Sequence, residues 1–218
     1  MIVNFWLLPI AVVLLWFPRQ WLRLGVKVIP LSPRHAPTDK DLRDARDISL
    51  RLRDELVKPR NWIDFSRAVT GSIGICFVCF DVQPDAPRNT GDLIFGIQCV
   101  VLLTAVAIQT IRFQHRLTLV APVFFILGLS FGLLGWQAAV FACVTIWVLN
   151  LLIPSPGFFL MVFAALEVLF SRLLAGGVPA KLVLLAAVIA TGPVIFSAMT
   201  NRRLVKLNRK KRNKPLGT

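Results

Sequence analysis

The sequence has few charged residues for its length. Charged side chains make up 17% of the 218 residues and apolar ones 56%, and the mean hydropathy is +0.70. Soluble domains have about a quarter of their residues charged, and their helices need a polar face. This scarcity excludes a water-soluble fold and predicts an all-α, polytopic transmembrane helix bundle. Between Leu93 and Met199 only five side chains carry a formal charge: Arg112, Arg116, Glu167, Arg172 and Lys181.

Histidine and cysteine are also scarce, and their spacing does not match a known kind of site. The two histidines, His35 and His115, fall in predicted loops. The four cysteines lie in apolar segments without a histidine or aspartate at metal-ligand spacing. We therefore predict no metal site, no cofactor and no catalytic residues, and we favour a protein that is not an enzyme. The cysteines are interpreted as small packing residues.

No lysine or arginine precedes the first apolar segment, residues 1–17. A secretory signal peptide would begin with basic residues, so this absence predicts an uncleaved helix. Arg19, Arg23 and Lys27 follow the segment directly. Because basic residues mark the cytoplasmic side of a membrane helix, we expect the N-terminus outside and residue 18 onward inside.

The apolar segments predict about seven spans, separated by short connections rich in proline and glycine. The second is doubtful, because its charge-free part, Ala68 to Phe80, is short against the roughly 20 residues that a span needs. Such short connections make consecutive helices antiparallel neighbours. The expected spans are residues 1–17, 62–82, 93–111, 117–134, 136–153, 158–175 and 180–199.

Two polar regions flank these spans. Residues 18–61 form an expected cytosolic loop with one amphipathic helix at about 39–57. The charges of residues 39–58 sum to zero. Residues 200–218 form a basic tail without an acid. If both regions are cytoplasmic, an even number of spans lies between them, so the doubtful second segment spans as well. Only three of the 25 lysines and arginines then fall outside: Arg88, Arg172 and Lys181. We expect a plasma or inner membrane protein with its C-terminus in the cytoplasm.

The basic tail is a candidate binding surface. Each such charge contributes about 1 kcal/mol near anionic lipid, so anionic headgroups at the inner surface are the first partner that we expect. An acidic protein is the alternative, and nucleic acid is disfavoured because the charges follow the topology of the spans. The bases are Arg202, Arg203, Lys206, Arg209, Lys210, Lys211 and Arg212.

Glu167 is the one acid in the apolar block and lies near the middle of the span at 158–175. An ionisable residue at that depth costs about 2.5–3.5 kcal/mol if it faces lipid, so we expect it to point inward. Thr191, at similar depth in the last span, is its expected hydrogen-bond partner. Glu167 is then either a protonated acid that joins two helices or a group in a transport pathway.

Gly128 and Gly132 form a G-x-x-x-G pattern in the span at 117–134. Small residues at this spacing allow helices to approach closely, either within the chain or between copies. In a chain with about seven spans we favour contact within the chain.

Three hypotheses for function remain open at this point. The favoured one is a non-catalytic assembly or scaffold subunit of a membrane complex, bound to other membrane proteins or to a second copy. The alternative is a small transporter or permease subunit that uses Glu167. A membrane enzyme acting on a lipid-linked substrate has the least support, because the sequence lacks a catalytic set of residues.

Overall fold

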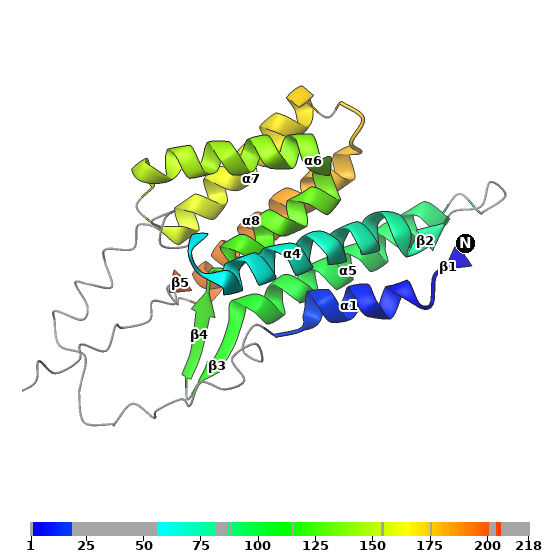
Figure 1. Cartoon of the computed structure of the whole chain (residues 1–218), viewed down its shortest axis with the longest axis horizontal. Coiled ribbons are helices and arrows are strands. Elements are labelled where there is room, and N and C mark those ends of the chain that lie inside the picture. Colours follow the sequence, from blue (N-terminus) through cyan, green and yellow to red (C-terminus); the bar gives the residue numbers. More distant parts are fainter. Residues whose placement is uncertain are drawn as a thin grey trace, which may run out of the picture.

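A computed structural model describes residues 2–18, 56–81, 87, 89–114, 116–153, 155–174, 176–200 and 204–205. Within these residues the chain folds into six α-helices and two small sheets (Figure 1). The expected cytosolic helix at 39–57 lies outside the described residues, apart from Leu56 and Val57. The same is true of the basic tail, apart from Thr200 and a two-residue strand.

In the part of the chain that the structure describes, four helices are long and apolar enough to cross a membrane. They are α5 (Thr90–Thr110), α6 (Val123–Leu149), α7 (Pro156–Leu174) and α8 (Ala180–Met199). A shorter apolar helix, α1, covers Leu7–Trp16. These helices agree with the prediction of a helical membrane protein.

Helix α6 is broken at Gly135, between the segments expected at 117–134 and 136–153. Gly135 has φ 78° and ψ 166°, a backbone conformation that glycine adopts without the steric cost of a Cβ atom. Figure 1 shows the two halves of α6 running in different directions. The first half lies at the centre of the bundle, since the apolar window of α6 is 72% buried against 28–33% in the other three long helices.

The doubtful second segment is helical but not uniformly apolar. Helix α4 covers Pro59–Ile73, with proline in its first turn, and continues into a π-helix, η2, over Gly74–Val78. Its buried residues include Asn61, Asp64 and Arg67 as well as small residues. Helix α4 packs mainly against α6 and α1. One face of α4 is therefore buried in the bundle and carries charged groups, whereas Trp62 and Ile63 on the other face are exposed.

The first span was expected to be helical from residue 1, and this is wrong for its first residues. Strand β1 (Ile2–Val3) pairs antiparallel with β2 (Phe80–Asp81), directly after η2. The backbone N–H of Asn4 donates to the carbonyl oxygen of Cys79 at 3.0 Å. These bonds hold the first residues extended, so the helix begins only at Leu7.

A helix was also expected to begin at residue 117, but Leu117–Val120 is part of a strand. Strands β3 (Ile111–Gln114) and β4 (Arg116–Val120) form an antiparallel hairpin. Strand β5 (Leu204–Val205) adds to β4 in parallel, in the order β3-β4-β5. Backbone pairing on both edges keeps β4 extended, so α6 starts at Val123.

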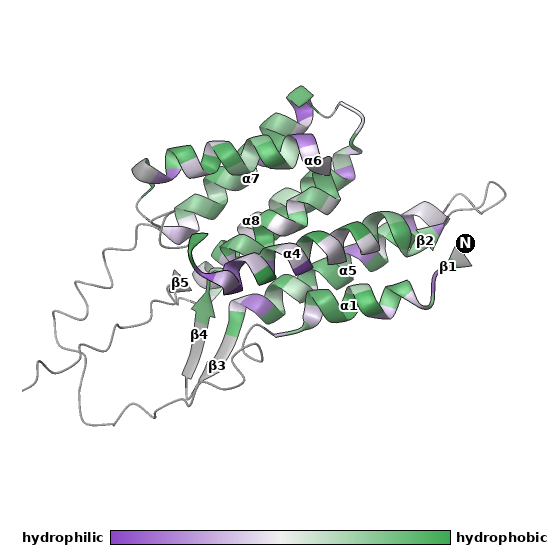
Figure 2. Ribbon diagram, in the orientation of Figure 1, coloured by the Kyte–Doolittle hydropathy of each residue, from purple (hydrophilic) through white to green (hydrophobic). Residues whose placement is uncertain are grey.

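Most residues of the helices are hydrophobic, as the hydropathy colouring of Figure 2 shows. The largest fully buried side chains include Phe125 on α6 and Phe159 and Phe163 on α7. On the same helices, Phe141 and Leu169 are about half exposed. Apolar residues on both faces are typical of helices surrounded by lipid.

Candidate functional site: two buried polar clusters

The buried polar side chains of the described residues include two groups at helix contacts. The acid cluster consists of Glu167 and Ser171 on α7 with Ser130 on α6. The arginine cluster consists of Asp64 and Arg67 on α4 with Gln109 on α5, and it surrounds the C-terminal end of α1.

Glu167 points into the bundle because of its place on α7. Phe159, Phe163, Glu167 and Ser171 follow at intervals of four residues, which places them on one face of a helix. All four are buried, and Glu167 is only 1% exposed. The expected inward orientation of the acid is therefore what the structure shows.

The partner of Glu167 is Ser130, from the first half of α6. The Ser130 hydroxyl is hydrogen-bonded to Oε1 of Glu167 and lies 3.2 Å from the carbonyl oxygen of Ile126 in its own helix. Among the described residues, neither Oε2 of Glu167 nor the hydroxyl of Ser171 has a hydrogen-bond partner. Cys143, on the second half of α6, lies within electrostatic range of the carboxyl. The acid thus occupies the contact between α7 and α6.

Thr191 does not make the contact with Glu167 that we expected. Its hydroxyl donates to the carbonyl oxygen of Ala187 at 2.8 Å, within α8. A threonine in a helix commonly satisfies its hydroxyl with the carbonyl four residues earlier, and this removes the need for another partner. Sequence reasoning missed Ser130, although it is the one hydroxyl between Gly128 and Gly132 in an otherwise apolar segment.

Gly128 and Gly132 lie against α4. A Cβ atom at Gly128 would come within 2.6 Å of the carbonyl oxygen of Phe65 and 2.8 Å of Cβ of Ala68. At Gly132 it would overlap with Ser72. Contact this close requires glycine, so the G-x-x-x-G pattern serves an interface within the chain. It places α4, with the arginine cluster, directly beside the helix that carries Ser130.

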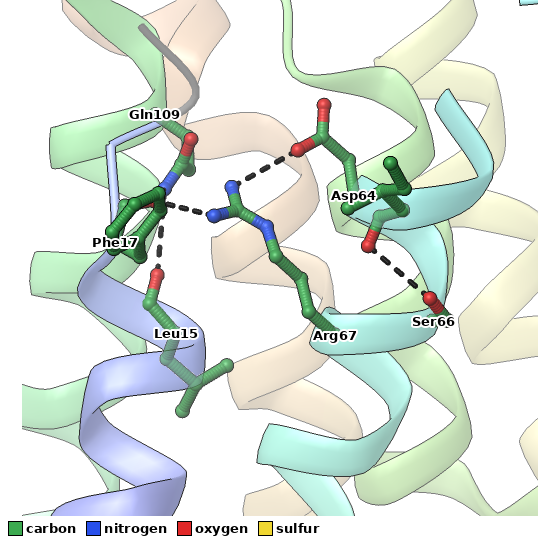
Figure 3. A network of polar contacts seen from close by, with 7 residues as sticks. Leu15, Phe17, Asp64, Ser66, Arg67 and Gln109 are labelled. Atoms are coloured by element: carbon green, nitrogen blue, oxygen red, sulfur yellow. Dashed lines mark hydrogen bonds and ion pairs between the residues drawn. The ribbon is translucent and has the colours of Figure 1, made fainter. Parts of the chain in front are cut away.

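Arg67 is the centre of the arginine cluster (Figure 3). Its Nη1 donates to the carbonyl oxygen of Phe17, and its Nη2 lies 3.1 Å from Oδ1 of Asp64, one turn earlier on α4. The side chains of Arg67 and Asp64 are 7% and 3% exposed. The guanidinium also lies 5.4 Å from the centre of the Phe125 ring, a cation–π distance. This is a buried ion pair with further support from a carbonyl and an aromatic ring.

Gln109 completes the cluster from α5. Its Nε2 donates to the carbonyl oxygens of Phe17 at 2.9 Å and Leu15 at 3.4 Å (Figure 3). The last carbonyl groups of a helix have no partner within that helix. Gln109 and Arg67 supply these partners and so fix the end of α1 to α4 and α5. Sequence reasoning missed this site because Arg67 was interpreted only as a charge at the cytoplasmic edge of a span.

The remaining predicted site residues lie outside the described chain: the basic tail of Arg202, Arg203, Lys206, Arg209, Lys210, Lys211 and Arg212. Binding of the tail to anionic lipid stays a prediction. Within the described residues, no group of three or more histidine, cysteine, aspartate or glutamate side chains is placed to hold a metal ion. In comparisons with known proteins, no family model, no curated protein and no solved structure matches this chain.

Proposed function

We propose that the chain spans the membrane seven times, with its N-terminus outside and its C-terminus in the cytoplasm. The directions of the helices in Figure 1 support this topology: α1, α4, α5, the two halves of α6, α7 and α8 run alternately toward opposite ends of the bundle. The ends of α1, α5 and α8 thus lie at the same end as the β3–β5 sheet. The segments with most of the lysines and arginines, 18–61 and 200–218, follow α1 and α8 directly.

Tryptophans near both ends of the helices support the same topology. Trp6 and Trp136 lie near the proposed outer end, the first before α1 and the second directly after the break in α6. Trp16 and Trp62 lie near the proposed inner end. All four side chains are at least 37% exposed. Tryptophan is enriched at the two interfaces of a membrane. The N–H groups of Trp16 and Trp62 donate to the carbonyl oxygens of Val101 and Leu56.

For function, we propose a non-catalytic subunit that assembles with other membrane proteins or with a second copy of itself. The observation that carries this proposal is how the buried polar groups are used. Arg67 and Gln109 are hydrogen-bonded to Phe17 at the end of α1, and Ser130 is hydrogen-bonded to Glu167 on α7. These groups hold the bundle together, which leaves the apolar outer faces and the basic tail to contact partners. Anionic lipid at the inner surface is the proposed lipid partner.

Purification in a mild detergent, followed by mass spectrometry, tests this assignment. We expect a partner protein, or a second copy of the chain, to co-purify with it in a fixed molar ratio. A lone, monodisperse monomer that carries lipid only would contradict the proposal. Replacing Lys210, Lys211 and Arg212 with glutamine serves as the matched comparison. This variant should lose binding to vesicles that contain anionic lipid but keep its protein partner.

Thiol labelling tests the topology separately. A reagent that cannot cross the membrane should label Arg88→Cys from outside, and Lys210→Cys only after the membrane is opened. Position 88 lies between β2 and α5 in the sequence, and position 210 lies in the tail. Labelling of both positions from the same side would contradict the seven-span topology.

A small transporter or permease subunit is the second candidate, favoured by one observation. Oε2 of Glu167 and the hydroxyl of Ser171 are buried polar atoms without a partner among the described residues. Intramembrane acids commonly mark ion and substrate pathways. In proteoliposomes, this candidate requires a pH-dependent flux that Glu167→Ala abolishes and Thr191→Ala retains. A flux that Glu167→Ala leaves unchanged would remove the acid from the pathway.

A further inference from the structure

The hydroxyl of Ser130 has two contacts but only one proton. A hydroxyl group donates one hydrogen bond and can accept others, whereas an ionised carboxylate only accepts. If Glu167 is ionised, Ser130 must donate its one proton to Oε1. Its hydroxyl then has no proton left to donate to the carbonyl oxygen of Ile126. If Glu167 carries a proton, the carboxyl donates to Ser130, and Ser130 donates to Ile126. Only the protonated acid makes both contacts hydrogen bonds.

The charges around Glu167 favour the same state. Among the described residues the ion pairs are Arg67–Asp64 and Lys181–Asp92, and neither includes Glu167. On α7 the nearest cation in sequence, Arg172, is exposed. From the second half of α6 the titratable neighbour is Cys143, which is not a cation. An unpaired carboxylate in such a setting would pay a large desolvation penalty, which a proton removes.

A second buried polar group without a partner among the described residues lies four residues after Glu167 on α7. Ser171 follows Glu167 by one turn of α7 and is 2% exposed. Side chains at this spacing have Cβ atoms about 5–6 Å apart, a distance that one water molecule can bridge. Buried water commonly binds where two or more polar atoms lack protein partners. Oε2 of Glu167 and Oγ of Ser171 are two such atoms.

We propose that Glu167, Ser130 and Ser171 form a buried proton-binding site with one bound water molecule. The carboxyl takes up one proton from the solvent and becomes neutral, and its O–H at Oε1 donates to Ser130. Ser130 in turn donates to Ile126. The water lies between Oε2 and the Ser171 hydroxyl, accepts from the hydroxyl and donates to Oε2. This site goes beyond the proposed assembly role, because it concerns the interior of one chain and requires no partner.

Infrared difference spectroscopy on the whole protein in lipid at neutral pH tests the protonation state. A protonated carboxyl absorbs as a C=O group, separately from ionised carboxylates. The spectrum of the wild type minus that of Glu167→Gln should show one C=O band, and Ser130→Ala should shift this band to higher frequency as it loses a hydrogen bond. A lost carboxylate band in place of the C=O band would overturn the proposal. If Glu167→Gln does not fold, the absence of a band shift between the wild type and Ser130→Ala would overturn it as well.

The bound water is tested with Ser171→Ala in heavy water. We expect this variant to lose one O–D stretching band and to shift the Glu167 C=O band, because Oε2 loses its donor. Thr191→Ala is the matched control, since that hydroxyl bonds to Ala187 in its own helix and should leave both bands in place. Identical spectra for the wild type and Ser171→Ala would show that Oε2 and Ser171 hold no water between them.

Discussion

The arginine cluster and the acid cluster place polar groups in the same apolar bundle in two different ways. Arg67 keeps a charge by gathering a carboxylate, a backbone carbonyl and an aromatic ring around its guanidinium. Glu167 has one hydroxyl group as its hydrogen-bond partner and no cation in the described ion pairs. The comparison indicates that a buried charge persists where an opposite charge is within reach, and that a lone acid is held neutral.

The two clusters also differ in how many helices they join. The arginine cluster joins α4 and α5 to the end of α1, a short helix of ten residues. The acid cluster adds one protein hydrogen bond to an interface between α6 and α7 that is mostly apolar. We therefore expect the arginine cluster to contribute much more to stability, and the following predictions test this difference from the largest effect to the smallest.

The largest effect is expected for Arg67→Met. The change leaves Asp64 buried beside α1 without its cation, and breaking a buried ion pair in this way costs about 3–5 kcal/mol. The free energy of unfolding in mixed detergent micelles measures the loss.

The double variant Asp64→Asn with Arg67→Met separates the charge from the packing. It removes both members of the pair, so it should recover more than half of the loss seen with Arg67→Met alone. Arg172→Ala, at an exposed position on α7, should change stability by less than about 0.5 kcal/mol. A double variant as unstable as Arg67→Met would show that the guanidinium acts through packing and not through Asp64.

A smaller effect is expected where the helices of the two clusters meet. Gly128→Ala puts a Cβ atom against the backbone of α4, which cannot move aside as a flexible side chain could, and should cost about 1–3 kcal/mol. Gly96→Ala, on α5, is the matched control, because a Cβ atom there meets nothing within 4 Å. The control should be neutral or slightly stabilising, since alanine favours helix. Equal losses in thermal unfolding would argue against the close α4–α6 contact.

The smallest effect is expected for Ser130→Ala, which removes a hydrogen bond between uncharged groups. Such a bond contributes about 1 kcal/mol, and unfolding in detergent should show a loss of that size. Thr191→Ala removes a hydroxyl that bonds within its own helix, so its loss should be smaller. A larger loss for Thr191→Ala would mean that α8, rather than α6, supplies the important polar contact.

Composition predicts the apolar helices of this architecture, because a long block with so few charges is typical of helices that can cross a membrane. The break at Gly135 could be anticipated, since only glycine readily adopts its positive φ. The last helix covers Ala180–Met199, the residues expected from hydropathy alone. Local composition suffices in these places because the physical cause lies within the segment itself.

The features that sequence reasoning missed depend on partners far along the chain. Strand β4 pairs with the neighbouring β3 and, at its last two residues, with Leu204 and Val205, and no local pattern predicts the second pairing. Arg67 is buried because the carbonyl of Phe17, fifty residues earlier, accepts its hydrogen bond. Where no such long-range partner exists, an arginine near the end of a span is expected to face the membrane surface.

The most direct test of the central comparison is to measure Arg67→Gln and Glu167→Gln in the same unfolding assay. Both changes replace an ionisable side chain with an amide of similar polarity. If Arg67 is charged and Glu167 is neutral, Arg67→Gln should lose about 3 kcal/mol or more, because Asp64 loses its counter-charge. Glu167→Gln should lose about 1 kcal/mol or less, because an amide can replace a neutral acid beside Ser130. Equal losses, or a larger loss for Glu167→Gln, would contradict the account.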